Sequence, residues 1–164
     1  MSDTRPLSIA IGADHRGSEA ARRLATMLGE QGHTCRLVGA CTGGNGTDAP
    51  CDYPEPAYHV AKLVASGAVD RGILICGTGI GMSIAANKVK GVRAAVVHDE
   101  LTANLSRSHN DANVLCVSAD LLGLTLIEKI AEVWLGTDFA GGRHQRRVDK
   151  IKMIEDGIDP ASAN

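Results

Sequence analysis

Five short runs of aliphatic residues alternate along this chain with longer segments whose apolar residues recur every three or four positions. The runs predict five β-strands, at residues 7–12, 34–38, 71–76, 92–97 and 113–118. The segments that follow them predict helices, at residues 18–29, 56–66, 80–88, 99–108, 122–135 and 142–156. Regular alternation of strand and helix is typical of a parallel sheet with helices on both faces. We therefore expect an α/β fold, a Rossmann-like three-layer α/β/α sandwich with a five-stranded parallel sheet.

Glycine, proline and polar residues mark the ends of these elements. Ser18 is a favourable N-cap for the first helix, and Pro56 suits the first turn of the second. The stretch 39–54 is too rich in Gly, Asn, Asp and Pro for regular structure. Since no repeat or low-complexity segment interrupts the pattern, we expect one domain over residues 1–157 and a flexible C-terminal tail at 158–164.

Composition narrows the class of protein. The 164 residues include 17 basic and 19 acidic ones, and the only aromatic residues are two Tyr, one Trp and one Phe. A nucleic-acid partner would require a basic stripe or stacking aromatics, so none is expected. No apolar run approaches the ~20 residues that span a membrane. The first seven residues lack the apolar centre of a signal peptide, so the expected location is the cytoplasm.

The five cysteines have no close-spaced metal-binding pattern, so free thiols are the default in a reducing compartment. Cys35 and Cys116 lie inside apolar runs and are expected to be inert core residues. Cys41 and Cys51 flank the Gly-rich loop. A zinc site or a loop disulfide is open there, ranked below two exposed or half-buried thiols.

Cys76 ends the third apolar run and is followed by three glycines at alternate positions, Gly77, Gly79 and Gly81. A glycine-rich turn before a helix lets backbone N–H groups converge on an anion, and the helix N-terminus adds positive charge. The spacing is neither the G-x-G-x-x-G dinucleotide fingerprint nor a Walker motif, which favours an anion site without a nucleotide. Cys76 is then either a buried small hydrophobe or a thiolate that acts as nucleophile or base. We favour the functional interpretation.

Other candidate residues lie in three polar stretches. In a parallel sheet, ligands bind beyond the carboxyl ends of the strands, and Asp14-His15, Cys76-Gly77-Thr78 and His98-Asp99 each follow a predicted strand. His109 lies in the stretch 106–113, which is either a loop with local hydrogen bonds or the place of an acid–base histidine. Arg143 and Arg147 are four residues apart and share one helix face, which suits either a phosphate or a solvated basic patch.

Six motifs together resemble one known family. They are Gly12-Ala13-Asp14-His15-Arg16-Gly17, Asp52-Tyr53-Pro54, residues 75–81, Ala85-Ala86-Asn87-Lys88, Ser108-His109-Asn110-Asp111 and residues 142–147. In this order, over residues 8 to about 157, they resemble the type B ribose-5-phosphate isomerases. The wider family includes galactose-6-phosphate isomerase subunits and allose-6-phosphate isomerases, so the match is specific for the family and weaker for the substrate.

The resemblance implies an isomerase of the pentose phosphate pathway that interconverts ribose 5-phosphate and ribulose 5-phosphate through a cis-enediolate. Cys76 corresponds to the general base that moves a proton between C1 and C2. His109 corresponds to the acid–base group that opens the sugar ring, and Asp14 handles the hydroxyl protons. Asn110 would support the oxyanion, and Thr78 would lie near the ring-opening end.

The resemblance also implies how the substrate is held. Backbone N–H groups would bind the enediolate oxygens, from Gly77, Gly79, Gly81, Met82 and Ser83. The phosphate ligands would be His15, Arg143 and Arg147. No metal or other cofactor is expected, because proton transfer carries the whole reaction. Family members are dimers or tetramers, so we expect a homodimer or homotetramer whose active sites are shared between subunits.

Two departures from the family pattern bear on the substrate. Asp120 follows the fifth strand where an arginine that binds phosphate is often found, so it is expected to point away or to pair with an arginine such as Arg143. The loop 40–51 is longer than usual and lies near the sugar end. The alternatives are therefore an isomerase of another aldose (allose 6-phosphate, galactose 6-phosphate or a free sugar) or a non-catalytic sugar-phosphate-binding protein.

Overall fold

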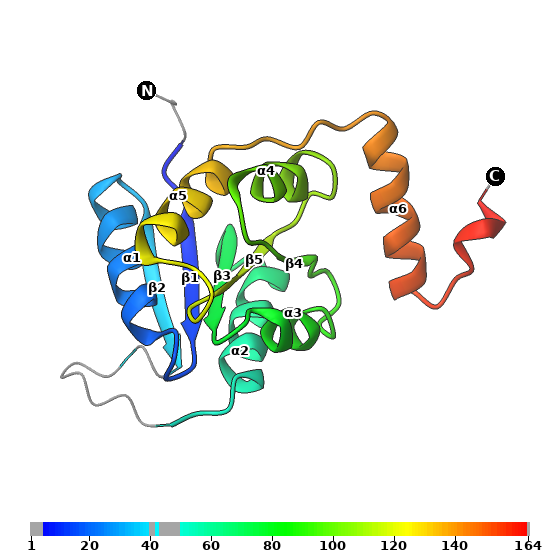
Figure 1. Cartoon of the computed structure of the whole chain (residues 1–164). Helices are drawn as coiled ribbons and strands as arrows, with labels where there is room; N and C mark the ends of the chain where they lie inside the picture. Colours follow the sequence, from blue (N-terminus) through cyan, green and yellow to red (C-terminus); the bar gives the residue numbers. More distant parts are fainter. Residues whose placement is uncertain (1–4, 40–41, 43–49, 164) are drawn as a thin grey trace.

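One parallel sheet forms the centre of the computed structural model, which describes residues 5–39, 42 and 50–163. The strand order is β2-β1-β3-β5-β4 (Figure 1). The strands are β1 (Ser8–Ala13), β2 (Thr34–Gly39), β3 (Arg71–Cys76), β4 (Ala94–Val96) and β5 (Val114–Ser118). Every pairing between neighbouring strands is parallel, which confirms the predicted five-stranded parallel sheet.

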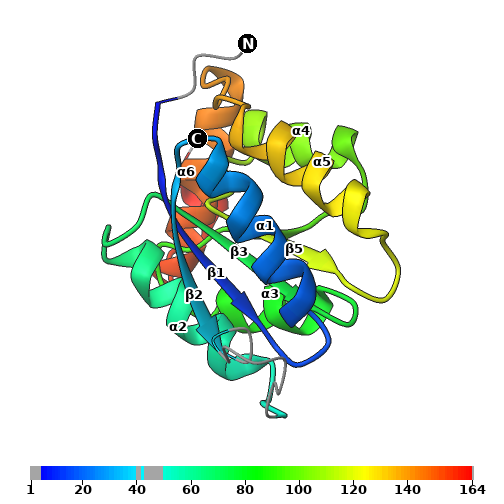
Figure 2. The ribbon, with the colours of Figure 1, turned by 90° about the vertical axis from the view of Figure 1, so that its left-hand side faces the viewer.

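Helices cover both faces of this sheet. They are α1 (Ser18–Glu30), α2 (Pro54–Ala65), α3 (Ile80–Ala86), α4 (Glu100–Ser108), α5 (Leu124–Leu135) and α6 (Arg143–Glu155). Alternate strand residues point to opposite faces, so Ile73 packs in the core beneath α1, α4 and α5, whereas Leu74 packs beneath α2 and α3. The two cores confirm the three-layer α/β/α sandwich, which Figure 2 shows from the side of α1.

Helix α6 stands apart from both layers, beyond the edge strand β4 (Figure 1). Its Ile151 and Ile154 remain 43% and 60% exposed.

The side chain of Asn87 covers part of the edge strand β4. Its Oδ1 accepts the Ala94 N–H at 2.8 Å, and its Nδ2 donates to the Ala94 carbonyl at 2.9 Å. The amide thus satisfies backbone groups of β4 that would otherwise be open to pairing with another strand.

Two predicted helix starts are wrong. Ser18 is the first residue of α1 and not its N-cap, because its hydroxyl donates back to the His15 carbonyl. The Asp14 carboxylate instead accepts the N–H groups of Arg16 and Gly17 just before the helix. Helix α2 begins at Pro54, since proline at the first helical position loses no intrahelical hydrogen bond.

Smaller differences concern the ends of other elements. Strand β4 is shorter than the predicted 92–97, and α3 stops at Ala86. Within the predicted tail, Pro160–Ser162 forms one 3₁₀ turn capped by the Asp159 side chain. Residues 40–41 and 43–49 of the predicted loop lie outside the described residues. In the described part of the chain, no helix has the length and apolar character that crossing a membrane requires.

Candidate active site

Cys76 lies at the carboxyl end of the central strand β3 and is 4% exposed. Its Sγ accepts a hydrogen bond from the Gly79 N–H at 3.2 Å. Gly79 adopts φ +77°, a conformation that favours glycine, and an added Cβ would lie 3.1 Å from the Val117 carbonyl carbon. The turn can therefore place this N–H on the sulfur only with glycine at position 79.

The turn from Gly77 to α3 presents fewer free donors than the sequence predicts. The Gly79 N–H contacts the sulfur, and the Ser83 N–H donates to the Gly79 carbonyl inside the helix. The Ser83 hydroxyl donates to the Ala94 carbonyl. The N–H groups of Gly79 and Ser83 thus have acceptors inside the chain, and their contact with a substrate oxygen stays a prediction.

First-turn N–H groups of a helix lack intrahelical acceptors, so those of Gly81 and Met82 remain candidates for binding an anion, with Gly77 before the helix. The Thr78 hydroxyl accepts the Ile80 N–H at 3.3 Å and holds the turn closed. Gly81 packs against Tyr53, whose ring an added Cβ would approach to 2.5 Å. Because α3 has only seven residues, these N–H groups matter more than the helix dipole.

Asp14 and His15 lie at the same edge of the sheet. The Asp14 N–H donates to the Ile75 carbonyl at 3.3 Å, so the turn after β1 runs directly beside Cys76. The Asp14 side chain is 6% exposed, and its Oδ1 accepts the N–H groups of Arg16 and Gly17. His15 is exposed. The structure thus brings Asp14, His15, Cys76 and the glycine turn together, as the topology predicted.

The remaining cysteines do not lie in the glycine turn. Cys116 is fully buried, and burial, followed by the nearby Cys76, raises the pKa of its thiol. Burial also raises the pKa of the half-buried Cys35. Cys51 is half-buried, and its thiol donates to the Ala13 carbonyl at 3.9 Å. Cys41, its proposed partner in a zinc site or disulfide, lies outside the described residues.

His109 and Asn110 lie at the opposite side of the sheet, near the amino ends of β4 and β5. They follow α4, and Arg93, which precedes β4, donates to the Asn110 carbonyl at 3.2 Å. β3 is 6 residues long, and at ~3.3 Å per residue its two ends lie roughly 16 Å apart. Within one chain, the predicted base Cys76 and the predicted ring-opening residue His109 therefore do not meet.

A second group of site residues forms around His109. Its imidazole stacks on that of His144, with ring centroids 4.0 Å apart and planes 8° from parallel. The Arg143 Nε–H donates to His144 Nε2 at 3.4 Å, and Arg147 lies one turn further along α6. Desolvation, and then the charges of His109, Arg143 and Arg147, lower the pKa of His144. The sequence interpretation named no role for His144, although its place between the two arginines was a signal.

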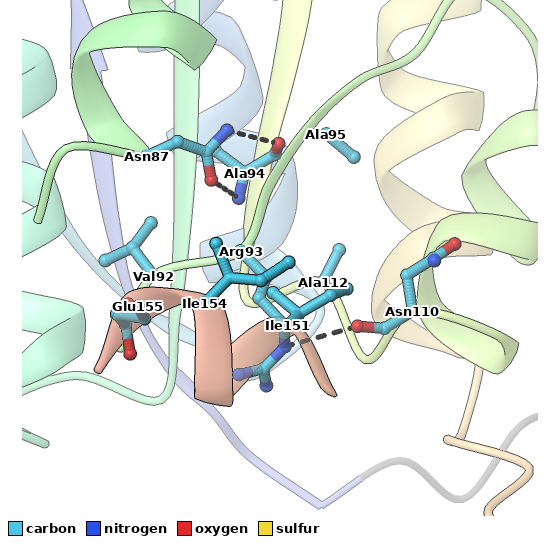
Figure 3. Close-up of a pocket in the computed structure, with 10 residues that line it drawn as sticks. All are labelled: Asn87, Val92, Arg93, Ala94, Ala95, Asn110, Ala112, Ile151, Ile154 and Glu155. Carbon is cyan, nitrogen blue, oxygen red and sulfur yellow. Dashed lines mark hydrogen bonds between the residues drawn. The ribbon is translucent and has the colours of Figure 1, made fainter. Parts of the chain in front are cut away.

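A cavity of about 420 Å³ lies beside this second group, between β4 and α6 (Figure 3). Ala94, Ile151 and Ile154 give it a largely apolar lining, and Asn110 lies at its rim. None of the residues around Cys76 contributes to it. The two groups of site residues are therefore separate in space, with Asp14, His15, Cys76 and Thr78 at one edge and His109, Asn110, Arg143 and Arg147 at the other.

Comparison with known proteins places this arrangement in a family. The family model described as Ribose/Galactose Isomerase matches residues 9–151. Ribose-5-phosphate isomerase B of Escherichia coli is 46% identical over 147 residues, covering 90% of this chain and 95% of that protein. A structure of the Clostridium thermocellum ribose-5-phosphate isomerase B has a TM-score of 0.86 at 45% identity, covering 92% of this chain and 98% of that one.

A further solved structure carries a sugar phosphate. It is ribose-5-phosphate isomerase B of Mycoplasma genitalium with bound ribulose 5-phosphate, which has a TM-score of 0.84 at 43% identity and covers 91% of this chain and 96% of that one. These matches span nearly the whole length of both chains, and the motifs that suggested the family fall inside the matched region. This chain belongs to the ribose/galactose isomerase family, with type B ribose-5-phosphate isomerases among its relatives.

Proposed function

We propose that this protein interconverts ribose 5-phosphate and ribulose 5-phosphate through a cis-enediolate, with Cys76 as the base. The observation that carries the proposal is the position of the Cys76 sulfur at the carboxyl end of β3. The sulfur accepts the Gly79 N–H, and the turn that contains Asp14 runs beside it. Relatives named for this reaction support the substrate. Such an isomerase acts in the pentose phosphate pathway of the cytoplasm.

The residues at this edge suit a balanced proton transfer. The Cys76 thiolate removes the proton from C2 of the open-chain aldose, which leaves an enediolate, and the thiol returns that proton to C1. The proton of the O2 hydroxyl must move to O1 in the same reaction, and we assign this transfer to the Asp14 carboxylate. The N–H groups of Gly77, Gly81 and Met82 stabilise the negative oxygen that forms between these steps.

We further propose that a second copy of the chain completes the site. In one chain, Cys76 lies at the carboxyl end of β3 and the second group lies beyond the opposite ends of the strands, and the two ends of β3 are roughly 16 Å apart. Ile80 and Ile84, one turn apart on α3 beside the glycine turn, are 52% and 58% exposed. Exposed apolar residues next to half a site favour an interface there. In a two-fold dimer the partner's copy of the second group would supply ring opening and phosphate binding at this edge.

The test is an assay of purified protein with ribose 5-phosphate, allose 6-phosphate, galactose 6-phosphate and free ribose. We expect ribose 5-phosphate to be the preferred substrate. Cys76→Ala should lose about 10³-fold in kcat, within the range of general base catalysis. Cys35→Ala is the matched control, since it removes a half-buried thiol on β2 and should retain activity.

Three results would contradict the proposal in different ways. Unchanged activity of Cys76→Ala would exclude the base assignment. Preferred turnover of another aldose would support the alternative isomerases. Binding of ribose 5-phosphate without turnover of any sugar would support the non-catalytic binding protein.

A further inference from the structure

Arg16 and Asp120 form an ion pair across the end of the central strand. The Arg16 Nε–H donates to both carboxylate oxygens of Asp120, at 3.0 and 2.8 Å, and Nη2 donates to Oδ1 at 2.8 Å. Arg16 follows β1 and Asp120 follows β5, the two strands on either side of β3. The pair therefore bridges the carboxyl end of β3, where Cys76 lies.

The bridge lies directly on the glycine that follows the catalytic cysteine. A Cβ added at Gly77 would be 2.8 Å from Asp120 Oδ2 and 3.4 Å from Arg16 Nε. The Asp120 N–H also donates to the Gly77 carbonyl at 3.1 Å. Asp120 is thus held beside Gly77 by its backbone N–H and by the contact of its side chain with Arg16. The sequence expectation that Asp120 pairs with an arginine is confirmed, but the partner is Arg16 and not Arg143.

The geometry leaves Arg16 able to bind a second anion. A guanidinium carries five N–H donors, and the contacts to Asp120 use donors on Nε and Nη2. In the described part of the chain, no acceptor contacts Nη1 of Arg16. Its side chain is 55% exposed, and its neighbour His15 is exposed in the same turn. A substrate that occupies the site at Cys76 would meet this cation.

A role in folding alone explains the pair poorly. Ion pairs between exposed side chains contribute little to stability, and these two side chains are 55% and 37% exposed. A guanidinium that a carboxylate already fixes loses less conformational freedom when it binds a ligand. The planar fork of arginine also matches the oxygens of a phosphate. The pair therefore favours a role for Asp120 in fixing the Arg16 side chain over a role in stabilising the fold.

We propose that Arg16 binds the phosphate group of the substrate and that Asp120 positions it. This inference rests on the proposed function for the identity of the substrate. Under this proposal, Arg16 in the turn after β1 joins its neighbour His15 in binding the phosphate. It also gives the acidic residue at position 120 a favourable role in a site that binds an anion.

A double-mutant cycle tests the inference, with Arg16→Gln, Asp120→Asn and the combined variant. Arg16→Gln should raise KM for ribose 5-phosphate about 10- to 100-fold, the usual range for a lost hydrogen bond to a charged group, with kcat changed much less. Asp120→Asn should raise KM less, because Arg16 remains but is no longer fixed. The combined variant should match Arg16→Gln, since Asp120 acts only through Arg16.

Other patterns of KM would overturn the inference. If Arg16 only neutralises Asp120, Asp120→Asn would lower KM and the combined variant would return to the wild-type value. If the pair is only structural, the melting temperature would fall while KM stayed unchanged in all three variants. Arg5→Gln is the matched control, because Arg5 also pairs with an aspartate, Asp70, but at the opposite end of β1. It should leave KM unchanged.

Calorimetry with inorganic phosphate separates this inference from the proposed function. Phosphate should bind the wild-type protein and bind Arg16→Gln about tenfold or more weakly. If no sugar phosphate is turned over but this difference is seen, the proposed reaction fails and the phosphate role of Arg16 stands. Equal binding of phosphate by both proteins would overturn the role of Arg16 whatever the activity.

Discussion

Cys76 and His109 lie at opposite edges of one sheet, separated by the length of β3, although both belong to the chemistry that the motifs predict. Each has its own neighbours. Cys76 lies with Asp14 and the glycine turn, whereas His109 stacks on His144 beside Arg143. This separation is the reason for proposing that two copies of the chain form each site together.

The first prediction concerns Gly79, whose N–H donates to the Cys76 sulfur. Gly79→Ala should reduce kcat strongly, because Gly79 donates to Cys76 and adopts φ +77° against the backbone of Val117. It should also destabilise the fold by roughly 2 kcal/mol or more, since strain and a close contact add. Gly91→Ala is the matched control. Gly91 has φ +86° with nothing within 4 Å of an added Cβ, so it should cost about 1 kcal/mol and leave kcat unchanged.

Urea unfolding and steady-state kinetics of the two variants check this prediction. Equal loss of stability in both variants would show that the contact with Val117 adds nothing to the conformational strain. Full activity of Gly79→Ala would exclude a role of this turn in aligning Cys76.

The second prediction concerns Asp111, which holds the loop after His109. Its backbone has φ 46°, and its carboxylate bonds Arg93 and the buried Arg107, each at 2.8 Å. Asp111→Asn keeps the shape and the tolerance for this φ but removes the charge. Because Arg107 is 4% exposed, losing its anionic partner should destabilise the fold by about 3 kcal/mol.

Asp149→Asn is the control for this measurement, because among the described residues Asp149 bonds only the exposed amide of Gln145 on α6. A surface change of this kind should stay within about 0.5 kcal/mol. Urea unfolding measures both. A cost of Asp111→Asn as small as that of the control would contradict the view that this carboxylate fixes the loop.

The third prediction concerns pH. The pKa of His144 is lowered from its ordinary value of 6.5, mainly by desolvation and then by the charge of His109. The unfolded chain therefore binds a proton at a higher pH than the folded chain does, so His144 makes stability fall as the pH drops below about 6.5. His144→Phe retains a flat ring for the stack and removes this titration. Its melting temperature should depend less on pH between 7 and 5 than that of the wild type, and an unchanged dependence would contradict the assignment.

Much of this architecture follows from local sequence patterns. The apolar runs that became β1, β3 and β5 are buried, so their hydrophobicity was a direct signal. Asp14 and Cys76 could be placed at one edge because parallel strands end together. The start of α1 was harder to predict, since Asp14 and Ser18 compete to bond the turn and only the folded geometry decides between them.

The missed features depend on elements far apart in the sequence. The pair of Arg16 and Asp120 joins the turns after β1 and β5, and neither turn alone indicates its partner. The stack of His109 on His144 requires the ends of α4 and α6 to meet. Such contacts arise from tertiary packing, so neither periodicity nor motif spacing could have predicted them.

The shared site is tested most directly by mixing two inactive variants, Cys76→Ala and His109→Ala, and refolding them together in equal amounts. Half of the dimers should then be mixed, and each should hold one site with both residues intact, so activity should recover to about a quarter of the wild type. Refolding wild type with the double variant distinguishes the alternatives further: a shared site predicts about a quarter of the wild-type activity, and a site within one chain predicts about half. The shared site predicts recovery in the first mixture and a quarter of the wild-type activity in the second. No recovery in the first, with both variants folded and dimeric, would contradict a site built from two chains.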